Sequence, residues 1–164
     1  MINKKVEAAI NSQIQAELYS AYLYLAMSAY CESLNFKGFA GWLKVQAQEE
    51  VEHAMKFYKF LLERGGVVQL QAIQKPPVNF GSPAKAFSQA YEHEQKVTGL
   101  INKLYELAKA QKDYAFEQFL HWFIEEQVEE EANTAEISEN MQKIGDKGNA
   151  IYMYDAYLGK RKPE

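Results

Sequence analysis

Four long segments of this chain have the residue spacing of an amphipathic helix, and each carries an ionisable residue in the middle of its apolar face. In the first segment, residues expected to be buried recur between Val6 and Cys31 at alternating steps of four and three. That spacing places them on one side of a helix, with Glu17 near the centre. Faces of this kind must pack against one another, so the pattern predicts a bundle of helices.

The same spacing predicts four long helices and a short fifth one, over about residues 6–34, 39–64, 83–111, 114–144 and 149–158. Asn3, Ser82 and Asp113 stand where helices begin, and their side chains are of the types that cap a first turn. Gly65 and Gly145 stand where helices end. The segment 35–38, which contains a glycine, is expected to be a break between the first two helices.

The connection over residues 67–82 is long and contains Pro76-Pro77. Short loops are enough to join antiparallel neighbours, so a connection of this length is predicted to cross the bundle from end to end. We therefore predict an all-α fold in one domain over residues 1–164. It is a four-helix bundle with a long crossover between helices 2 and 3 and a short fifth helix at the C-terminal end.

The ionisable residues on the four faces lie at similar depth, so packing would bring them into one layer. They are Glu17, then Glu50 with His53, then Glu94, then Glu130 beside Gln127. Several carboxylates removed from water together repel one another and require protons or cations as compensation. No Lys or Arg lies on these faces at this level. Four carboxylates carry −4 and two divalent ions carry +4, so a di-metal site would neutralise the layer.

The spacing of Glu50 and His53, at i and i+3, allows both side chains to bind one ion. Single carboxylates from the facing helices would complete the site, and Glu50 could bridge to a second ion. Many oxygen ligands with one imidazole suit iron or manganese better than structural zinc. Calcium seldom takes a histidine ligand.

Longer motifs surround these residues. They are residues 14–24 (IQAELYSAYLY), 48–54 (QEEVEHA), 91–94 (YEHE) and 122–131 (WFIEEQVEEE). Together with the ERGG sequence at 63–66 and Lys75-Pro76-Pro77, they resemble prokaryotic non-haem ferritins, in the ferritin-like di-iron superfamily. The resemblance covers essentially the whole chain. It implies that Glu17, Glu50 and His53 hold a first iron ion, with Glu50 bridging, and that Glu94 and Glu130 hold a second.

The resemblance also implies roles for residues around the two ions. Gln127 would line the second position through hydrogen bonds, and Tyr24 would be a hydrogen-bond partner or an electron donor. Four carboxylates would form a third iron site: Glu49, Glu126, Glu129 and Glu130. Part of the acidic run 125–131 must nevertheless face solvent, because its residues cannot all point to one site. His93 and His121 lack carboxylate companions, and we expect them to be structural or surface residues.

The function implied by the resemblance is iron storage with ferroxidase activity. Fe(II) would be oxidised by oxygen or peroxide and stored as ferric mineral in a hollow homo-oligomeric cage of twenty-four subunits. The fifth helix would lie at the four-fold axes of this cage. Bacterioferritins have a haem-binding Met directly after the bridging Glu, whereas this chain has Val51, so no haem is expected. The chain has no Cys-x-x-Cys pair, so no rubrerythrin-type domain is expected either.

The composition of the chain limits which binding partners and which cellular location are expected. The net charge of −4 argues against nucleic-acid binding, and no apolar run is long enough to span a membrane. Cys31 is the only cysteine, and we expect it to be a buried apolar residue. No signal peptide is visible, so a cytoplasmic location is expected. The basic residues 160–162 are expected to be a solvated tail.

Two other functions use the same residues. The first is a di-iron oxidase, oxygenase or peroxidase acting on another substrate, which would need an apolar pocket beside the metals. The second is a non-enzymatic helical module, either a DNA-protecting mini-cage or a structural bundle. The mini-cage relatives build their iron site between subunits, whereas the ligands predicted here come from all four helices of one chain.

Overall fold

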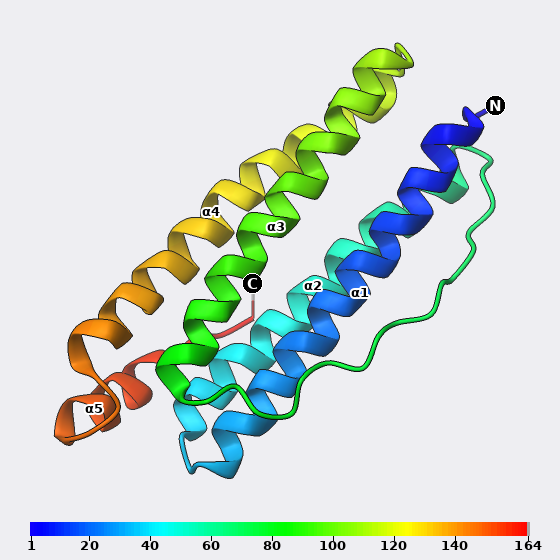
Figure 1. The fold of residues 1–164 in the computed structure, drawn as a ribbon. Helices are drawn as coiled ribbons and strands as arrows, with labels where there is room; N and C mark the ends of the chain where they lie inside the picture. The colour runs from blue at the N-terminus through cyan, green and yellow to red at the C-terminus, as the bar shows by residue number, and fades with distance from the viewer. Residues whose placement is uncertain (164) are drawn as a thin grey trace.

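The computed structural model describes residues 1–163 and shows four long helices side by side, with a short fifth helix at one end (Figure 1). The helices are α1 (Lys4–Ser33), α2 (Lys37–Glu63), α3 (Pro83–Ala110), α4 (Tyr114–Ile144) and α5 (Asn149–Leu158). Helices α1 and α2 form one antiparallel pair, and α3 and α4 form the other. Residues 1–163 contain no strand. The predicted all-α bundle with a fifth helix is confirmed.

The ends of the helices are fixed by the residues that the sequence indicated. The side chains of Asn3, Ser82 and Asp113 each accept a hydrogen bond from a backbone N–H in the first turn of the helix that follows. Such a bond satisfies one of the N–H groups that a helix start leaves without a partner. Gly65 and Gly145 follow α2 and α4 with φ values of 71° and 75°, a backbone conformation that glycine adopts without steric cost.

The expected break at 35–38 is shorter than predicted, because α2 already begins at Lys37. Gly38 lies inside the first turn, and a Cβ there would be 1.7 Å from the backbone oxygen of Asp155 in α5. The Asp155 side chain also accepts a hydrogen bond from the backbone N–H of Phe39 at 2.8 Å. Position 38 therefore requires a glycine because α5 packs against α2 there without room for a side chain. Gly38 is part of α2 and does not interrupt it.

The crossover between α2 and α3 runs along the length of the bundle beside α1, as predicted (Figure 1). A buried asparagine holds its first part. Asn11 donates from Nδ2 to the Val67 carbonyl at 2.9 Å and accepts at Oδ1 from the Gln69 backbone N–H at 2.7 Å. Farther along, Phe80 is buried against Tyr30, with the ring centroids 5.6 Å apart. These contacts fix an irregular segment on the surface of α1.

The bundle interior has two apolar clusters separated by polar residues. The α5-end cluster includes Tyr24, Met27, Cys31, Phe39, Leu43, Phe87 and Met141. The N-terminal-end cluster includes Val6, Ile10, Phe57, Leu61, Phe116, Leu120 and Phe123. Between them lies what we call the central polar layer, which consists of buried Glu17, Glu50, His53, Glu94, Gln127 and Glu130. The helical spacing in the sequence predicted both the apolar faces and this interruption.

Cys31 lies in the α5-end cluster and is fully buried, as expected for a small apolar residue. Burial raises the pKa of its thiol to about 12, so this sulfur is unreactive at neutral pH. Within residues 1–163, none of the helices is both long enough and apolar enough to cross a membrane.

Candidate metal centre

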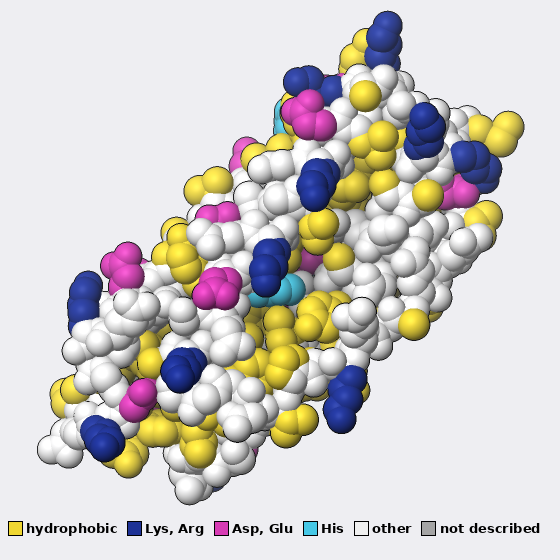
Figure 2. Space-filling view, in the orientation of Figure 1, with side chains coloured by type: hydrophobic (Ala, Val, Ile, Leu, Met, Phe, Trp, Pro, Cys, Tyr) yellow, Lys and Arg dark blue, Asp and Glu magenta, His cyan; other side chains and the backbone are white. Residues whose placement is uncertain are grey.

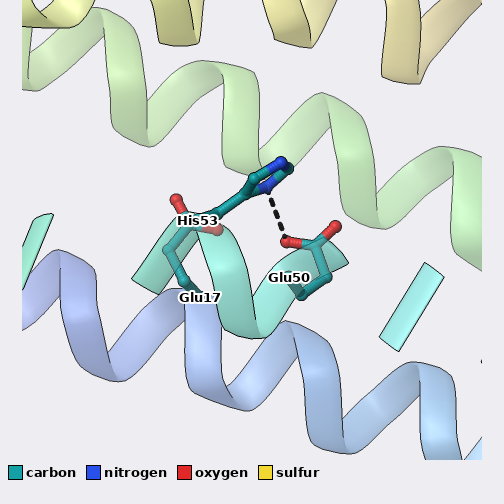
Figure 3. Close-up of side chains that lie close together, drawn as sticks. All are labelled: Glu17, Glu50 and His53. Atoms are coloured by element: carbon teal, nitrogen blue, oxygen red, sulfur yellow. Dashed lines mark ion pairs between the residues drawn. The ribbon is translucent and has the colours of Figure 1, made fainter. Parts of the chain in front are cut away.

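Three predicted ligands come together between α1 and α2. One ligand atom each from Glu17, Glu50 and His53 lies within 4.8 Å of the others (Figure 3). The His53 Nδ1 atom is 3.3 Å from Glu50 Oε2, which reflects their i and i+3 positions on α2. Glu17 enters from the facing helix α1. All three residues are at most 4% exposed, so this group can surround a cation away from bulk water.

His53 belongs to a second group that spans α2 and α4. Ligand atoms of His53, Glu126 and Glu130 also lie within 4.8 Å of one another. The His53 Nε2 atom is 3.6 Å from Glu126 Oε1, on the opposite side of the ring from Glu50. The two groups share the imidazole and are therefore adjacent parts of one cluster.

Glu94 accepts hydrogen bonds from Gln127, which was predicted to line the second ion position, and from Tyr24, which was predicted to be a hydrogen-bond partner or an electron donor. The Tyr24 hydroxyl donates a hydrogen bond to Glu94 Oε1. Gln127 donates from Nε2 to Glu94 Oε2 at 3.2 Å and is also 3.2 Å from Thr98 Oγ1. These contacts orient the Glu94 carboxylate from α1 and α4.

Two further buried glutamines donate hydrogen bonds to carboxylates of the central polar layer, and neither was predicted to have a role there. Gln13 donates to Glu17 Oε1 at 2.8 Å. Gln46 donates from Nε2 to both carboxylate oxygens of Glu130 at 2.8 Å and to Glu50 Oε1 at 3.2 Å. Each glutamine precedes a glutamate of the layer by four residues and is buried on the same helical face. The spacing of four residues in the sequence could therefore have indicated that both glutamines contact a carboxylate of the layer.

The electrostatics of the layer disfavour ionised carboxylates unless a cation is present. Burial raises the pKa of Glu17 well above its usual range, and the neighbouring charge of Glu50 raises it further. The pKa of Glu50 is also raised well above its usual range by burial, then by the charges of Glu94 and Glu130. Burial raises the pKa of Glu94, and burial followed by the charge of Glu94 raises that of Glu130 to about 8.

The layer has the properties that a divalent metal ion requires. Glu17 Oε2 is buried and accepts no hydrogen bond, so this acceptor is available to a cation. No ion pair between a Lys or Arg and a carboxylate within residues 1–163 involves Glu17, Glu50, Glu94 or Glu130. Carboxylate oxygens with one imidazole fit iron or manganese among the common metals.

The residues predicted for a third metal position are only partly brought together. Glu126 lies with His53 and Glu130, as described above. Glu49 Oε2 is 2.5 Å from Nη2 of Arg161. Glu129 is exposed and lies outside both groups of ligand atoms.

The contact with Arg161 corrects the expectation that residues 160–162 form a solvated tail. The Arg161 side chain is only 20% exposed. It packs on α2 because α5 turns the chain back across the end of the bundle (Figure 1). Helical periodicity describes one helix at a time, so it could not show a contact between residues 112 positions apart.

The two remaining histidines lie outside the groups of ligand atoms, as expected. Nε2 of His93 is 2.8 Å from Ser20 Oγ, and burial lowers the pKa of this histidine to about 4. His121 is exposed and lies beside Tyr105. His93 also lines a groove of about 510 Å³ between α1, α3 and the crossover, which opens on the face shown in Figure 2. The His93 ring is nearly perpendicular to the Tyr24 ring, with the centroids 6.3 Å apart.

A model of the ferritin-like domain matches residues 7–144, which include every predicted ligand of the layer. The chain belongs to the ferritin family. The bacterial non-heme ferritin of Bacteroides fragilis (strain 638R) is 42% identical over 161 residues, which cover 98% of this chain and 100% of that protein. The bacterial non-heme ferritin of Staphylococcus aureus (strain MRSA252) is 38% identical over 98% of this chain and 97% of its own length.

Solved ferritin structures agree with the fold of this ferritin. An open pore ferritin from the hyperthermophilic archaeon Archaeoglobus fulgidus superposes with a TM-score of 0.97 and 47% sequence identity. The match covers 99% of this chain and 100% of that one. An engineered closed form of the same archaeal ferritin superposes equally well, with a TM-score of 0.97. The bundle, the crossover and the fifth helix are therefore those of a ferritin.

Proposed function

We propose that this chain is an iron-storage ferritin whose central polar layer binds Fe(II) as a substrate and oxidises it to Fe(III). The observation that carries the proposal is the convergence of carboxylates and one histidine from α1, α2 and α4, with raised carboxyl pKa values. Glu94 of α3 lies outside these groups of ligand atoms but is buried, and its charge acts on Glu50 and Glu130. Such a layer is unfavourable in an apolar interior unless cations bind there. Membership of the ferritin family supports iron as the cation.

In this proposal Glu17, Glu50 and His53 bind one Fe(II), and Glu50 extends to a second ion held by Glu94 and Glu130. Oxidation of two Fe(II) ions releases two electrons, which oxygen or peroxide takes up. Gln13 and Gln46 donate hydrogen bonds to ligand carboxylates and so fix their orientation. Outer hydrogen bonds of this kind set how closely the ligands match the geometry that the ions prefer.

Tyr24 is placed to assist electron transfer. Burial, followed by the charge of Glu94, raises the pKa of the phenol well above its usual range, so the hydroxyl keeps its proton at neutral pH. That proton is directed at Glu94 Oε1. If Tyr24 gives up an electron, its proton can pass to this carboxylate, so no positive charge remains on the buried ring.

We further propose that the chain assembles into the cage of twenty-four subunits implied by its family. The outer surface of α1, α2 and the crossover supports assembly, because large apolar side chains are exposed there: Tyr22, Leu25, Val51, Met55 and Ile73, each at 40–50%. Exposed apolar surface of this kind commonly marks a contact between proteins. Closed shells are built by repeating such contacts between copies of one chain.

The experiment that tests this function is a titration of metal-free protein with Fe(II) in air. Absorbance follows the oxidation, and size-exclusion chromatography follows the particle. We expect fast oxidation of about two Fe(II) per chain, followed by uptake of many more ions into a large particle. Oxidation that stops at about two ions per chain in a small oligomer would indicate a di-iron enzyme with another substrate. A protein that binds no iron would contradict both functions.

A further inference from the structure

Arg161, which follows α5, is enclosed by three side chains on one face of α2. Its guanidinium carbon lies 4.3 Å from the centroid of the Trp42 ring. Its Nη1 donates to Gln46 Oε1 at 2.7 Å, and its Nη2 donates to Glu49 Oε2 at 2.5 Å. A ring face, an amide oxygen and a carboxylate are together a site for a cation.

The position of Arg161 is fixed by the packing of α5 on α2. Gly38 and Gly159 lie so close that a Cβ on Gly159 would be 2.9 Å from the Gly38 Cα. The side chain of Asp155 accepts a hydrogen bond from the Phe39 backbone N–H on the same turn of α2. After Gly159 the chain makes one more hydrogen-bonded turn, with the Arg161 N–H donating to the Leu158 carbonyl at 3.2 Å. The packing of α5 on α2 therefore places the Arg161 guanidinium against α2.

Arg161 contacts the polar layer through Gln46. The guanidinium donates a hydrogen bond to the oxygen of the Gln46 amide. The amide nitrogen therefore points the other way and donates to Glu130 and Glu50. Its other contact, Glu49, lies close enough to Glu130 for its charge to act on that carboxyl. Arg161 thus supplies a positive charge at the border of the layer, beside one of the carboxylates predicted to bind a third iron ion.

We propose that Arg161 is a built-in counter-ion at the third metal position, and that a metal ion that takes Glu49 Oε2 as a ligand displaces this guanidinium. The inference rests on the proposed iron-binding function. A carboxylate oxygen that accepts a short hydrogen bond from a guanidinium is a poorer ligand, because the metal and the guanidinium attract the same electrons. Arg161 would therefore weaken the third position most, because it acts on the first two positions only through the Gln46 amide. It is a positioning residue and is not itself a ligand.

The test is a calorimetric titration of the metal-free, full-length protein with Zn²⁺, which binds similar ligands without being oxidised. We expect R161A to bind the weakest of three ions about tenfold more tightly than the unmodified chain, a difference of ~1.4 kcal/mol. R161K should give a smaller gain, because lysine keeps the charge but lacks the planar fork. K160A is the matched control, since Lys160 is exposed in the same tail, and it should behave like the unmodified chain. E49Q should lose the third ion and keep the first two.

A second readout follows Arg161 directly. In a W122F background, Trp42 is the only tryptophan, and its emission should change when the third Zn²⁺ equivalent binds. R161A should lack that change. Third-site affinity that is unaltered or weaker in R161A, or that survives in E49Q, would overturn the proposal. Failure of the proposed function would look different, because the first two Zn²⁺ ions would then fail to bind in every variant.

Discussion

The apolar clusters and the central polar layer are built from the same four helical faces, yet they affect the stability of the molecule in opposite ways. In the N-terminal-end cluster, Phe57 is fully buried and its ring centroid lies 4.2 Å from that of Phe123. Burial of such side chains stabilises a fold by roughly 1.5–3 kcal/mol each. One turn away from Phe57, His53 lies beside Glu17 and Glu50, and burial disfavours the ionised forms of these two carboxyl groups.

The apolar ends of the bundle supply the stability that the polar middle requires. Glu17 and Glu50 are held in an interior where their ionised forms are unfavourable because the apolar packing above and below fixes the helices. The layer becomes favourable only when cations bind. Substitutions in the two regions should therefore separate stability from metal binding.

The largest expected effect comes from removing two ligands at once. Replacing Glu50 and His53 with Ala should abolish fast iron oxidation, with a rate loss of more than a hundredfold. Substitution of residues that only hydrogen-bond to metal ligands already lowers metal affinity or activity by roughly 10–100-fold. The metal-free variant should remain folded, because the substitutions remove a buried carboxylate with a raised pKa. Stopped-flow absorbance and circular dichroism measure the two properties. An unchanged oxidation rate would refute the site.

The opposite result is expected in the apolar region. Phe57→Ala should lower the free energy of unfolding by about 3–5 kcal/mol, the usual cost of deleting a buried phenylalanine ring. Chemical denaturation of the metal-free protein measures this loss. Zn²⁺ affinity at the first two positions should change little in the folded variant. Lys59→Ala on the same helix is the control, since that side chain is 76% exposed. Equal losses in both variants would contradict the assignment of stability to the cluster.

Glu130→Gln tests whether the layer is destabilising without metal. The pKa of Glu130 is raised from 4.5 to about 8, so the folded state holds a proton that the unfolded state loses between these values. The metal-free protein must then lose stability as pH rises from about 5 to 8, by up to ~1.4 kcal/mol per pH unit for this carboxyl. The variant should show a shallower decline, measured as melting temperature against pH. Parallel curves for the two proteins would count against the raised pKa.

The smallest effect is expected at Gln46. Gln46→Ala removes the amide that donates to Glu130 and Glu50, and should weaken Zn²⁺ binding at the layer by about tenfold. Titration calorimetry measures the change. Gln48→Ala, two residues away and exposed, should leave the affinity unaltered. If both variants bind equally well, Gln46 has no part in orienting the ligands.

Helical spacing made most of the fold predictable, because it repeats over the whole length of each helix. It also revealed the layer, since Glu17 and Glu130 interrupt otherwise apolar faces. Gly38 was wrongly predicted to lie in a break between helices. A glycine is needed there because Asp155 of α5, far away in the sequence, packs against this position. Arg161 was missed for the same reason. The ligand role of exposed Glu129 stays a prediction, because a side chain at the surface can adopt many orientations.

We infer that the buried carboxyl groups hold protons in the metal-free protein and exchange them for metal ions. The most direct test is to count the protons released when Fe(II) binds without oxygen at pH 7, by calorimetry in buffers of different ionisation enthalpy. Because Glu17, Glu50, Glu94 and Glu130 all have raised pKa values, we predict release of more than about one proton per chain. The release should fall in Glu130→Gln. Binding of Fe(II) without any proton release would contradict the account.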